Sequence, residues 1–169
     1  MKSFAVGVAL LASITFLATD ARAQSSDAVF TTRSLTVETA LRAAQAALNA
    51  CRKAGYQVGV AVTDRSGVLQ VYLRDRFAGA HTVEVAARKA WTSASFRMTT
   101  TALAAETQAG RSMSGIRNSP GVLAIGGGMP IESAGAVIAA IGVSGAPGGE
   151  ADDACAKAGI DAIQMDIEL

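Results

Sequence analysis

The sequence has little of several residue types on which common functional sites depend. Its 169 residues include one histidine, two cysteines and three prolines, and aromatic side chains make up 5% of the chain. Charged residues make up 17%, with 15 Lys and Arg against 14 Asp and Glu. Because binding to nucleic-acid phosphates needs clustered Lys and Arg, we expect no nucleic-acid partner. The balance of charge also argues against a dedicated surface for anionic membranes.

Signatures of hydrolytic and nucleotide chemistry are missing as well. The sequence contains no Gly-x-x-x-x-Gly-Lys for a phosphate loop and no His-Glu-x-x-His for a metalloprotease. Residues 142–146 approach a Gly-x-Ser-x-Gly nucleophile elbow but end in Ala146. A catalytic triad would also have to use His81, the single histidine. We therefore do not expect ordinary hydrolytic activity.

The N-terminal residues 1–23 have the organisation of an export signal. Lys2 precedes an uncharged stretch from Phe4 to Leu17, and Ala21-Arg22-Ala23 supplies a small-x-small cleavage pattern. The uncharged stretch is shorter than the roughly 20 residues that span a bilayer, so we expect no stable membrane anchor after cleavage. A periplasmic or secreted protein is predicted, and an uncleaved anchor or a buried helix is the alternative.

The redox state expected for the two cysteines depends on the predicted periplasmic or extracellular location. Cys51 and Cys155 are 104 positions apart and lack the spacing of a zinc site. In an oxidising compartment such a pair predicts one disulfide. Two separate buried thiols are the alternative.

Hydrophobic periodicity predicts an α+β fold. An amphipathic helix is expected over residues 37–53, with Cys51 on its buried stripe. Residues 57–63 and 68–74 predict a hairpin closed by a turn at 64–67. A mostly antiparallel sheet with helices packed on it fits this order, in one domain over residues 35–169 that follows a flexible lead-in at 24–34. Further helices are expected from about residue 82, after residues 99–101 and after residue 149, and further strands at 121–125, 130–133 and 136–144.

His81 is the candidate metal ligand of the sequence. It lies just before or at the start of the second helix, where the helix dipole disfavours imidazolium. Neutral imidazole is the form that ligates haem iron or another metal. A partly exposed histidine that caps the helix is the alternative. Soft thioether ligands could come instead from Met98, Met113 or Met129, although core packing is the commoner role of methionine.

Cations and glycines near His81 suggest how a ligand could be held. Arg74, Arg76 and Lys89 are the cations expected near the carboxylates of a ligand, and solvated surface is their alternative role. Gly145 belongs to a glycine-rich segment, 142–145, that permits close approach of a ligand to the backbone. Residues 126–128 have the same character, and tight turns explain both segments equally well.

Four segments resemble the GlcG/HbpS haem-binding family, over about residues 35–165. They are Val62–Gly67, Arg88–Ala90, Pro120–Ile131 and Ala140–Glu150. The chain is most similar to the exported branch of the family, whose members carry a signal peptide. The resemblance implies a profilin-like α/β/α domain: a five-stranded, mostly antiparallel sheet with helices on both faces. It also implies that the protein forms a homo-oligomer.

Three functions follow from these observations. The first is non-covalent binding of haem or a related tetrapyrrole for sequestration or for redox or haem sensing, with slow haem degradation as the most enzyme activity expected. The second is a non-haem accessory or sensor module that binds an organic acid. The third is an oligomeric scaffold for a redox-signalling partner. Scarce aromatic residues weigh against a tetrapyrrole pocket, since ligand pockets are usually rich in them.

Overall fold

The computed structural model describes residues 28–168. The chain divides into two units, up to Thr31 and from Thr32 onwards, and the sheet and helices belong to the second unit. The predicted export signal at 1–23 lies outside the described residues, as does the start of the predicted lead-in. Residues 28–34 contain no helix or strand. No helix within the described residues is long and apolar enough to cross a membrane.

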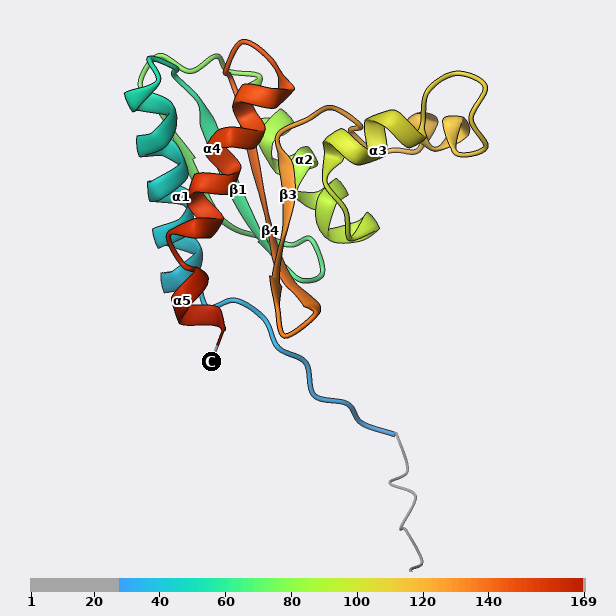
Figure 1. The fold of residues 1–169 in the computed structure, drawn as a ribbon, viewed down its shortest axis with the longest axis horizontal. Helices are drawn as coiled ribbons and strands as arrows, with labels where there is room; N and C mark the ends of the chain where they lie inside the picture. Colours follow the sequence, from blue (N-terminus) through green and yellow to red (C-terminus); the bar gives the residue numbers. More distant parts are fainter. Residues whose placement is uncertain (1–27, 169) are drawn as a thin grey trace, which may run out of the picture. The chain divides into compact units, whose positions relative to one another are not determined.

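A four-stranded antiparallel sheet forms the middle of the domain (Figure 1). Its strands lie in the order β2-β1-β4-β3. The central strand β4 is almost entirely buried. Pro130, which cannot donate a ladder hydrogen bond, lies in an edge strand, as expected. The strands are β1 (Gly59–Asp64), β2 (Leu69–Arg74), β3 (Gly128–Ser133) and β4 (Ala136–Ser144).

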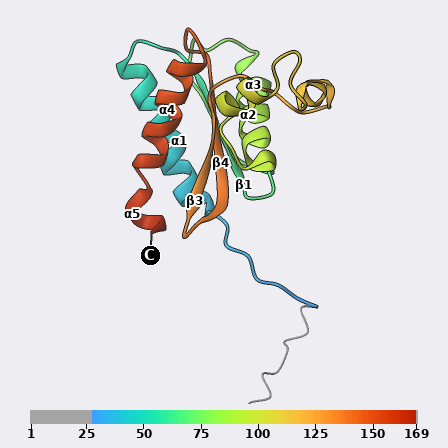
Figure 2. The same ribbon diagram turned by 45° about the vertical axis from the view of Figure 1, so that its right-hand side comes forward.

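Helices cover both faces of this sheet (Figures 1 and 2). Helices α1 (Val37–Lys53) and α4 (Gly149–Asp161) lie side by side on one face, and α2 (Thr82–Phe96) covers the other. The predicted α+β, profilin-like α/β/α arrangement is confirmed. The remaining helices are short: α3 (Thr100–Glu106), a 3-10 helix η1 (Ser114–Asn118) and α5 (Gln164–Ile167).

The predicted fifth strand, at residues 121–125, is wrong. Side chains of α2 bind this apolar segment in place of a neighbouring strand. Arg88 donates to the carbonyl oxygens of Gly121 and Val122, and the Leu123 N–H donates to Thr92 Oγ1. Because these backbone groups are already hydrogen-bonded, the segment runs beside α2 without joining the sheet.

Local signals account for α1 and its connection to α4. Thr36 caps α1 by accepting a hydrogen bond from the Thr39 N–H, as predicted. Cys51, on the buried side of α1, forms a disulfide with Cys155 of α4, with 5.5 Å between their Cα atoms. The predicted pairing of the two cysteines is therefore confirmed.

Helix α2 lies unusually close to the sheet. A Cβ atom at Gly142 of β4 would be 2.1 Å from the Ala86 carbonyl oxygen and 2.6 Å from the Ala90 nitrogen. Such distances leave no room for any side chain at position 142. At Gly142 the helix therefore contacts the sheet through Ala86 and Ala90. The larger side chains on its flank lie beside the sheet.

A buried ion pair joins α2 to the start of α4. Lys89 Nζ lies 2.7 Å from Asp152 Oδ2 and donates to the Val143 carbonyl oxygen at 2.9 Å. Asp152 Oδ1 accepts the Ala146 N–H at 3.0 Å. Only 3% of the Lys89 side chain and 5% of the Asp152 side chain are exposed. Burial raises the pKa of Asp152, and the hydrogen bond from Lys89 opposes that rise.

Removing one partner of this pair should destabilise the domain strongly. We expect Lys89→Met to lower the free energy of unfolding by about 3–5 kcal/mol, because Asp152 would be left buried without its cation. The double variant Lys89→Met/Asp152→Leu should recover much of this loss. Urea unfolding measures both.

The control is Lys157→Met, which breaks the exposed Lys157–Asp161 pair of α4. Exposed pairs contribute about 0–1 kcal/mol. A loss for Lys89→Met no larger than for this control would contradict the structural role of the buried pair.

Candidate functional site

A bulge in the hairpin directs one apolar side chain toward α2. Val62 pairs with Val71, but Thr63 pairs with Leu69, so Gln70 is the extra residue of β2. Side chains alternate along a strand, and the extra residue therefore returns Leu69 to the same face as Thr63. This is the α2 face, where Ala61 packs against Ala86 and Ala90.

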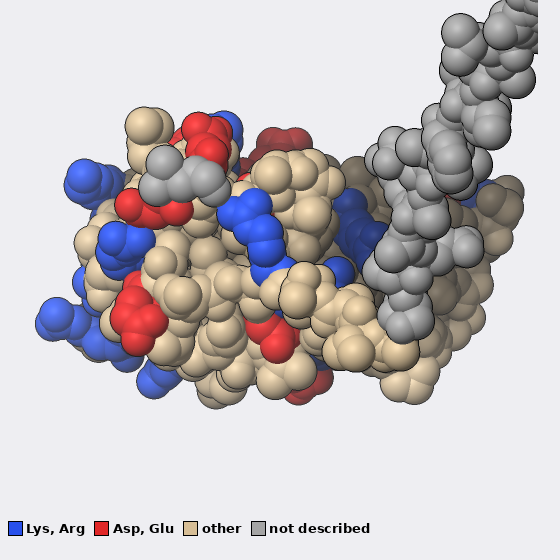
Figure 3. All heavy atoms as spheres, turned by 90° about the horizontal axis from the view of Figure 1, so that it is seen from below, with Lys and Arg blue, Asp and Glu red and all other residues tan. Residues whose placement is uncertain are grey.

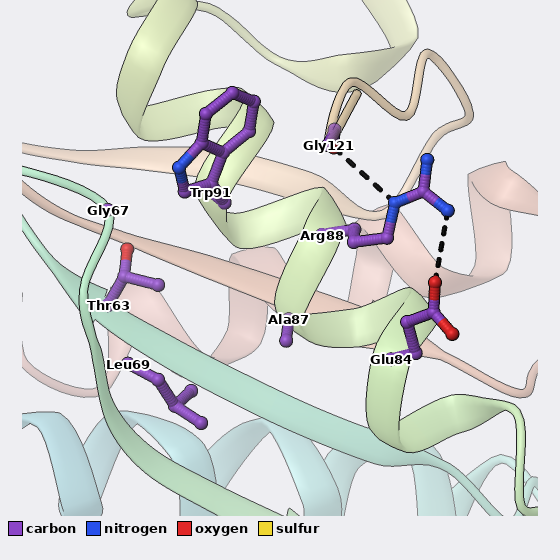
Figure 4. A pocket seen from close by; sticks show the side chains of 8 residues that line it. All are labelled: Thr63, Gly67, Leu69, Glu84, Ala87, Arg88, Trp91 and Gly121. Atoms are coloured by element: carbon purple, nitrogen blue, oxygen red, sulfur yellow. Dashed lines mark hydrogen bonds and ion pairs between the residues drawn. The ribbon is translucent and has the colours of Figure 1, made fainter. Parts of the chain in front are cut away.

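Leu69 lines a hollow between the hairpin and the flank of α2 (Figure 4). We call it the Trp91 hollow; its volume is about 320 Å³ and its walls are mostly apolar. The hairpin provides one wall, α2 the other, and Gly121 closes the end beside Trp91. The lining residues are Thr63, Gly67, Leu69, Glu84, Ala87, Arg88, Trp91 and Gly121.

Two glycines hold the indole of Trp91 in the wall of the hollow. Gly67, in the hairpin turn, has φ +85°, and a Cβ there would lie 2.9 Å from Trp91 Cδ1. Gly121 has φ +88°, and a Cβ there would lie 3.3 Å from Cζ3. Both positions combine a left-handed backbone with close approach to the ring, which favours glycine. The indole is therefore fixed by backbone on two sides.

Arg88 and Glu84 form the polar rim of the hollow. The Arg88 guanidinium donates to the Gly121 carbonyl oxygen at 3.4 Å and to Glu84 Oε1 at 3.2 Å (Figure 4). It also donates to the Val122 carbonyl oxygen at 3.0 Å. Arg88 therefore fixes the segment that closes the hollow. Glu84 places a carboxylate at the opening, and its side chain is 74% exposed.

The loop between β2 and α2, residues 75–81, is held at its base by a buried carboxylate. Asp75 accepts hydrogen bonds from Arg52 Nε at 2.7 Å and Nη2 at 3.1 Å. It also accepts the Arg76 N–H at 2.9 Å, while its own N–H donates to the Val58 carbonyl oxygen. The hydrogen bond from Arg52 holds the pKa of Asp75 below its ordinary value of 3.8. The loop consequently presents Phe77, with 79% of the residue exposed, from a fixed base.

His81 lies at the end of this loop, as the residue before α2, and is exposed. Its side chain makes no capping hydrogen bond. The ring folds over Gly79: a Cβ there would lie 2.6 Å from Nδ1 but 3.8 Å from Nε2. Nε2 is thus the ring nitrogen farther from this position at Gly79. The spacing 81, 84, 88 and 91 also places His81 on the same flank of α2 as the lining residues Glu84, Arg88 and Trp91.

The three predicted cations do not lie together. Arg74 and Arg76 are exposed beside the β2–α2 loop, and Arg74 donates to the Ala78 carbonyl oxygen. Lys89 is buried and paired with Asp152, so its predicted place near the carboxylates of a ligand is wrong. Basic and acidic side chains are interspersed on the visible face of the described residues in Figure 3.

The predicted methionines lie apart from His81, whereas Gly145 lies close to Thr82, the residue that follows His81. Met98 packs in a small cluster beyond the other end of α2, and Met129 packs against the core on the α1 face of the sheet. Met113 is 39% exposed at the start of η1. A Cβ at Gly145, which has φ +127°, would lie 2.6 Å from the Gln57 carbonyl oxygen. The close approach at Gly145 is therefore to the chain's own backbone.

No cluster of three or more His, Cys, Asp or Glu that could hold a metal ion occurs among the described residues.

Sequence reasoning missed the Trp91 hollow and the exposure of Phe77. Trp91 fitted the apolar stripe of a helix. The spacing of apolar residues does not tell whether such a side chain points at the sheet or lies at the side of the helix. The turn glycine Gly67 was a usable signal, because the indole of Trp91, in the third turn of α2, can pack over it only if that position lacks a side chain. The bulge that redirects Leu69 depends on pairing, which local sequence does not specify.

The Asp75–Arg52 contact predicts how stability depends on pH. The folded-state pKa of Asp75 is lowered, so its charge stabilises the fold above the unfolded-state pKa and this contribution is lost as the pH falls through the folded value. We expect Asp75→Asn to be less stable at neutral pH and to lose stability less steeply below about pH 4. Thermal unfolding across pH 2–7 is the measurement.

Asp166→Asn is the matched control, because Asp166 forms an exposed ion pair with Arg42. If Asp75→Asn retained the acid dependence of the unchanged protein, the proposed contribution of Asp75 would be refuted.

Known proteins share the sequence pattern of this chain over most of its length. The family model described as "Haem degrading protein HbpS-like" matches residues 35–161. A comparison with curated proteins gives no match.

Three solved structures illustrate the similarity. A double mutant of HbpS from Streptomyces reticuli is 34% identical, with a TM-score of 0.77, and the match covers 93% of this chain and 98% of that one. Protein ORFY from Klebsiella pneumoniae is 25% identical, with a TM-score of 0.78, covering 81% and 95%. A PduOC:heme complex is 27% identical, with a TM-score of 0.72, covering 77% and 95%. With a family model matching most of its length, this chain belongs to the HbpS-like family.

Proposed function

We propose that this chain binds haem, or a related tetrapyrrole, non-covalently after export to the periplasm or the medium. The observation that carries the proposal is the Trp91 hollow, an apolar hollow with a fixed indole wall on the same flank of α2 as His81. The family description and the haem complex of the PduOC relative support haem as the ligand. The Cys51–Cys155 disulfide supports an oxidising compartment.

The residues present fit part of a tetrapyrrole. At about 320 Å³ the hollow is at the small end of ligand pockets, which span roughly 300–1,000 Å³. Leu69, Ala87 and Trp91 offer apolar surface for one edge of a planar macrocycle. The rest of the macrocycle would lie along the α2 flank toward the β2–α2 loop.

His81 is the residue that we propose to ligate the iron. Its imidazole is exposed, makes no capping hydrogen bond and has Nε2 turned away from Gly79. When bound, haem would supply an iron centre for ligand binding and redox chemistry. The chain's own residues would hold and orient it: His81 at the iron, and Trp91 and Leu69 at the apolar edge. Sequestration and sensing are the roles that this arrangement suits.

Titration of the protein with haemin tests this function. We expect saturable binding with one haemin per chain, a shifted Soret band and quenching of fluorescence from Trp91, the single tryptophan. His81→Ala should weaken binding by at least about tenfold and move the Soret band, because it removes the proposed iron ligand. Gln45→Ala is the control, since Gln45 is an exposed residue of α1 on the other face of the sheet.

The alternatives correspond to other results. Unchanged haemin binding by His81→Ala would keep the haem function and remove His81 as ligand. Absence of saturable binding in the unchanged protein would refute the haem function and favour the organic-acid module.

A further inference from the structure

The two ends of the α2 flank differ in their chemistry. At one end, the Trp91 hollow presents Leu69, Ala87 and the indole. At the other end, the last residue of β2 and the β2–α2 loop present Arg74, Arg76 and His81, all exposed. Since β2 leads directly through this loop into α2, Leu69 and Arg74 lie at opposite ends of the same edge strand. A ligand on this flank therefore meets an apolar end and a cationic end.

Arg88 is the obvious anchor for a ligand carboxylate, but its guanidinium is already engaged. All three of its nitrogens donate within the protein, to Gly121, Val122 and Glu84. Glu84 adds a negative charge at the opening of the hollow, and like charges brought close together repel. The hollow is consequently a poor place for the carboxylates of a ligand.

Arg76 has the opposite character. Its side chain forms no ion pair or hydrogen bond within the residues that the structure describes, and its backbone N–H is fixed by Asp75. The carboxylate of Asp75 is buried and forms its ion pair with Arg52, so Arg76, although its charge also helps to lower the pKa of Asp75, forms no ion pair with that carboxylate. The loop base is thus rigid while the guanidinium of Arg76 is free to bind an anion. Phe77 adds an exposed aromatic ring next to it.

We infer that the flank recognises tetrapyrroles whose carboxylates are confined to one edge, with that edge at Arg74 and Arg76 and the opposite, apolar edge in the Trp91 hollow. This inference rests on the proposed function and adds an orientation and a selectivity to it. Macrocycles with carboxylates on every edge are disfavoured, because one of their charged edges would have to enter the apolar hollow beside Glu84.

Three iron porphyrins test the inference: haemin, with two carboxylates on one edge, its dimethyl ester, and iron uroporphyrin, with eight carboxylates. Quenching of Trp91 fluorescence measures the affinity of each. We expect iron uroporphyrin to bind at least about tenfold more weakly than haemin. Arg76→Gln should weaken haemin about threefold to tenfold, as for loss of one exposed ionic contact, and leave the ester within about twofold.

Two variants separate the ends of the site. Ala87→Leu, which fills the hollow, should weaken haemin and the ester equally. Arg33→Gln removes an exposed cation next to Leu35, which packs in the core on the α1 face, and should change neither. Near-ultraviolet circular dichroism of each variant confirms that its fold is intact.

The outcomes distinguish this inference from the function on which it rests. Equal effects of Arg76→Gln on haemin and the ester, or equal binding of uroporphyrin and haemin, would overturn the orientation while haem binding stands. If haemin itself did not bind saturably, both the function and the orientation would be overturned.

Discussion

The close approach of α2 to the sheet is the constraint on which the rest of the structure depends. Gly142 lets the backbone of α2, at Ala86 and Ala90, lie against β4 where any side chain would collide. Where it passes Gly142, the helix has no space beneath it for a large side chain. Trp91 and Arg88 are therefore placed on its flank, where they form the wall and the rim of the Trp91 hollow.

Charged residues then stabilise α2 from two directions by different means. The buried Lys89–Asp152 pair ties the helix to α4 across the end of the sheet, in a setting where an unpaired charge would be costly. Asp75, through Arg52, fixes the loop that leads into the helix. Asp152 and Asp75 each form an ion pair with a cation of the protein, whereas Arg74 and Arg76 stay exposed near His81. The flank of α2 is therefore cationic at the end near His81 and apolar at the end near Trp91.

The sequence predicted correctly the features that depend only on residues close to one another in the chain. The cap at Thr36, the turn at Asp64–Gly67 and the limit that Pro130 sets on β3 each depend on neighbouring residues, and all three predictions are confirmed. Residues 121–125 could not be predicted, because an apolar run has the pattern of a strand and its partner here is α2. Lys89 could not be placed either, since its partner is 63 positions away. The hollow depends on a bulge and on two glycines from separate segments, and its chemistry was therefore visible only in the folded chain.

The proposed haem function requires that the macrocycle bind on the flank of α2. The most direct measurement is a set of ¹H–¹⁵N spectra of the labelled protein during titration with gallium protoporphyrin IX, a diamagnetic analogue of haemin. We expect the largest chemical-shift changes at the amides of Leu69, Phe77, Ala87 and Trp91 and at the Trp91 indole N–H. The chemical shifts of the amides of α1 and α4 should stay unchanged. Shifts centred on α1 and α4, with the Trp91 indole unaffected, would contradict binding on the flank of α2.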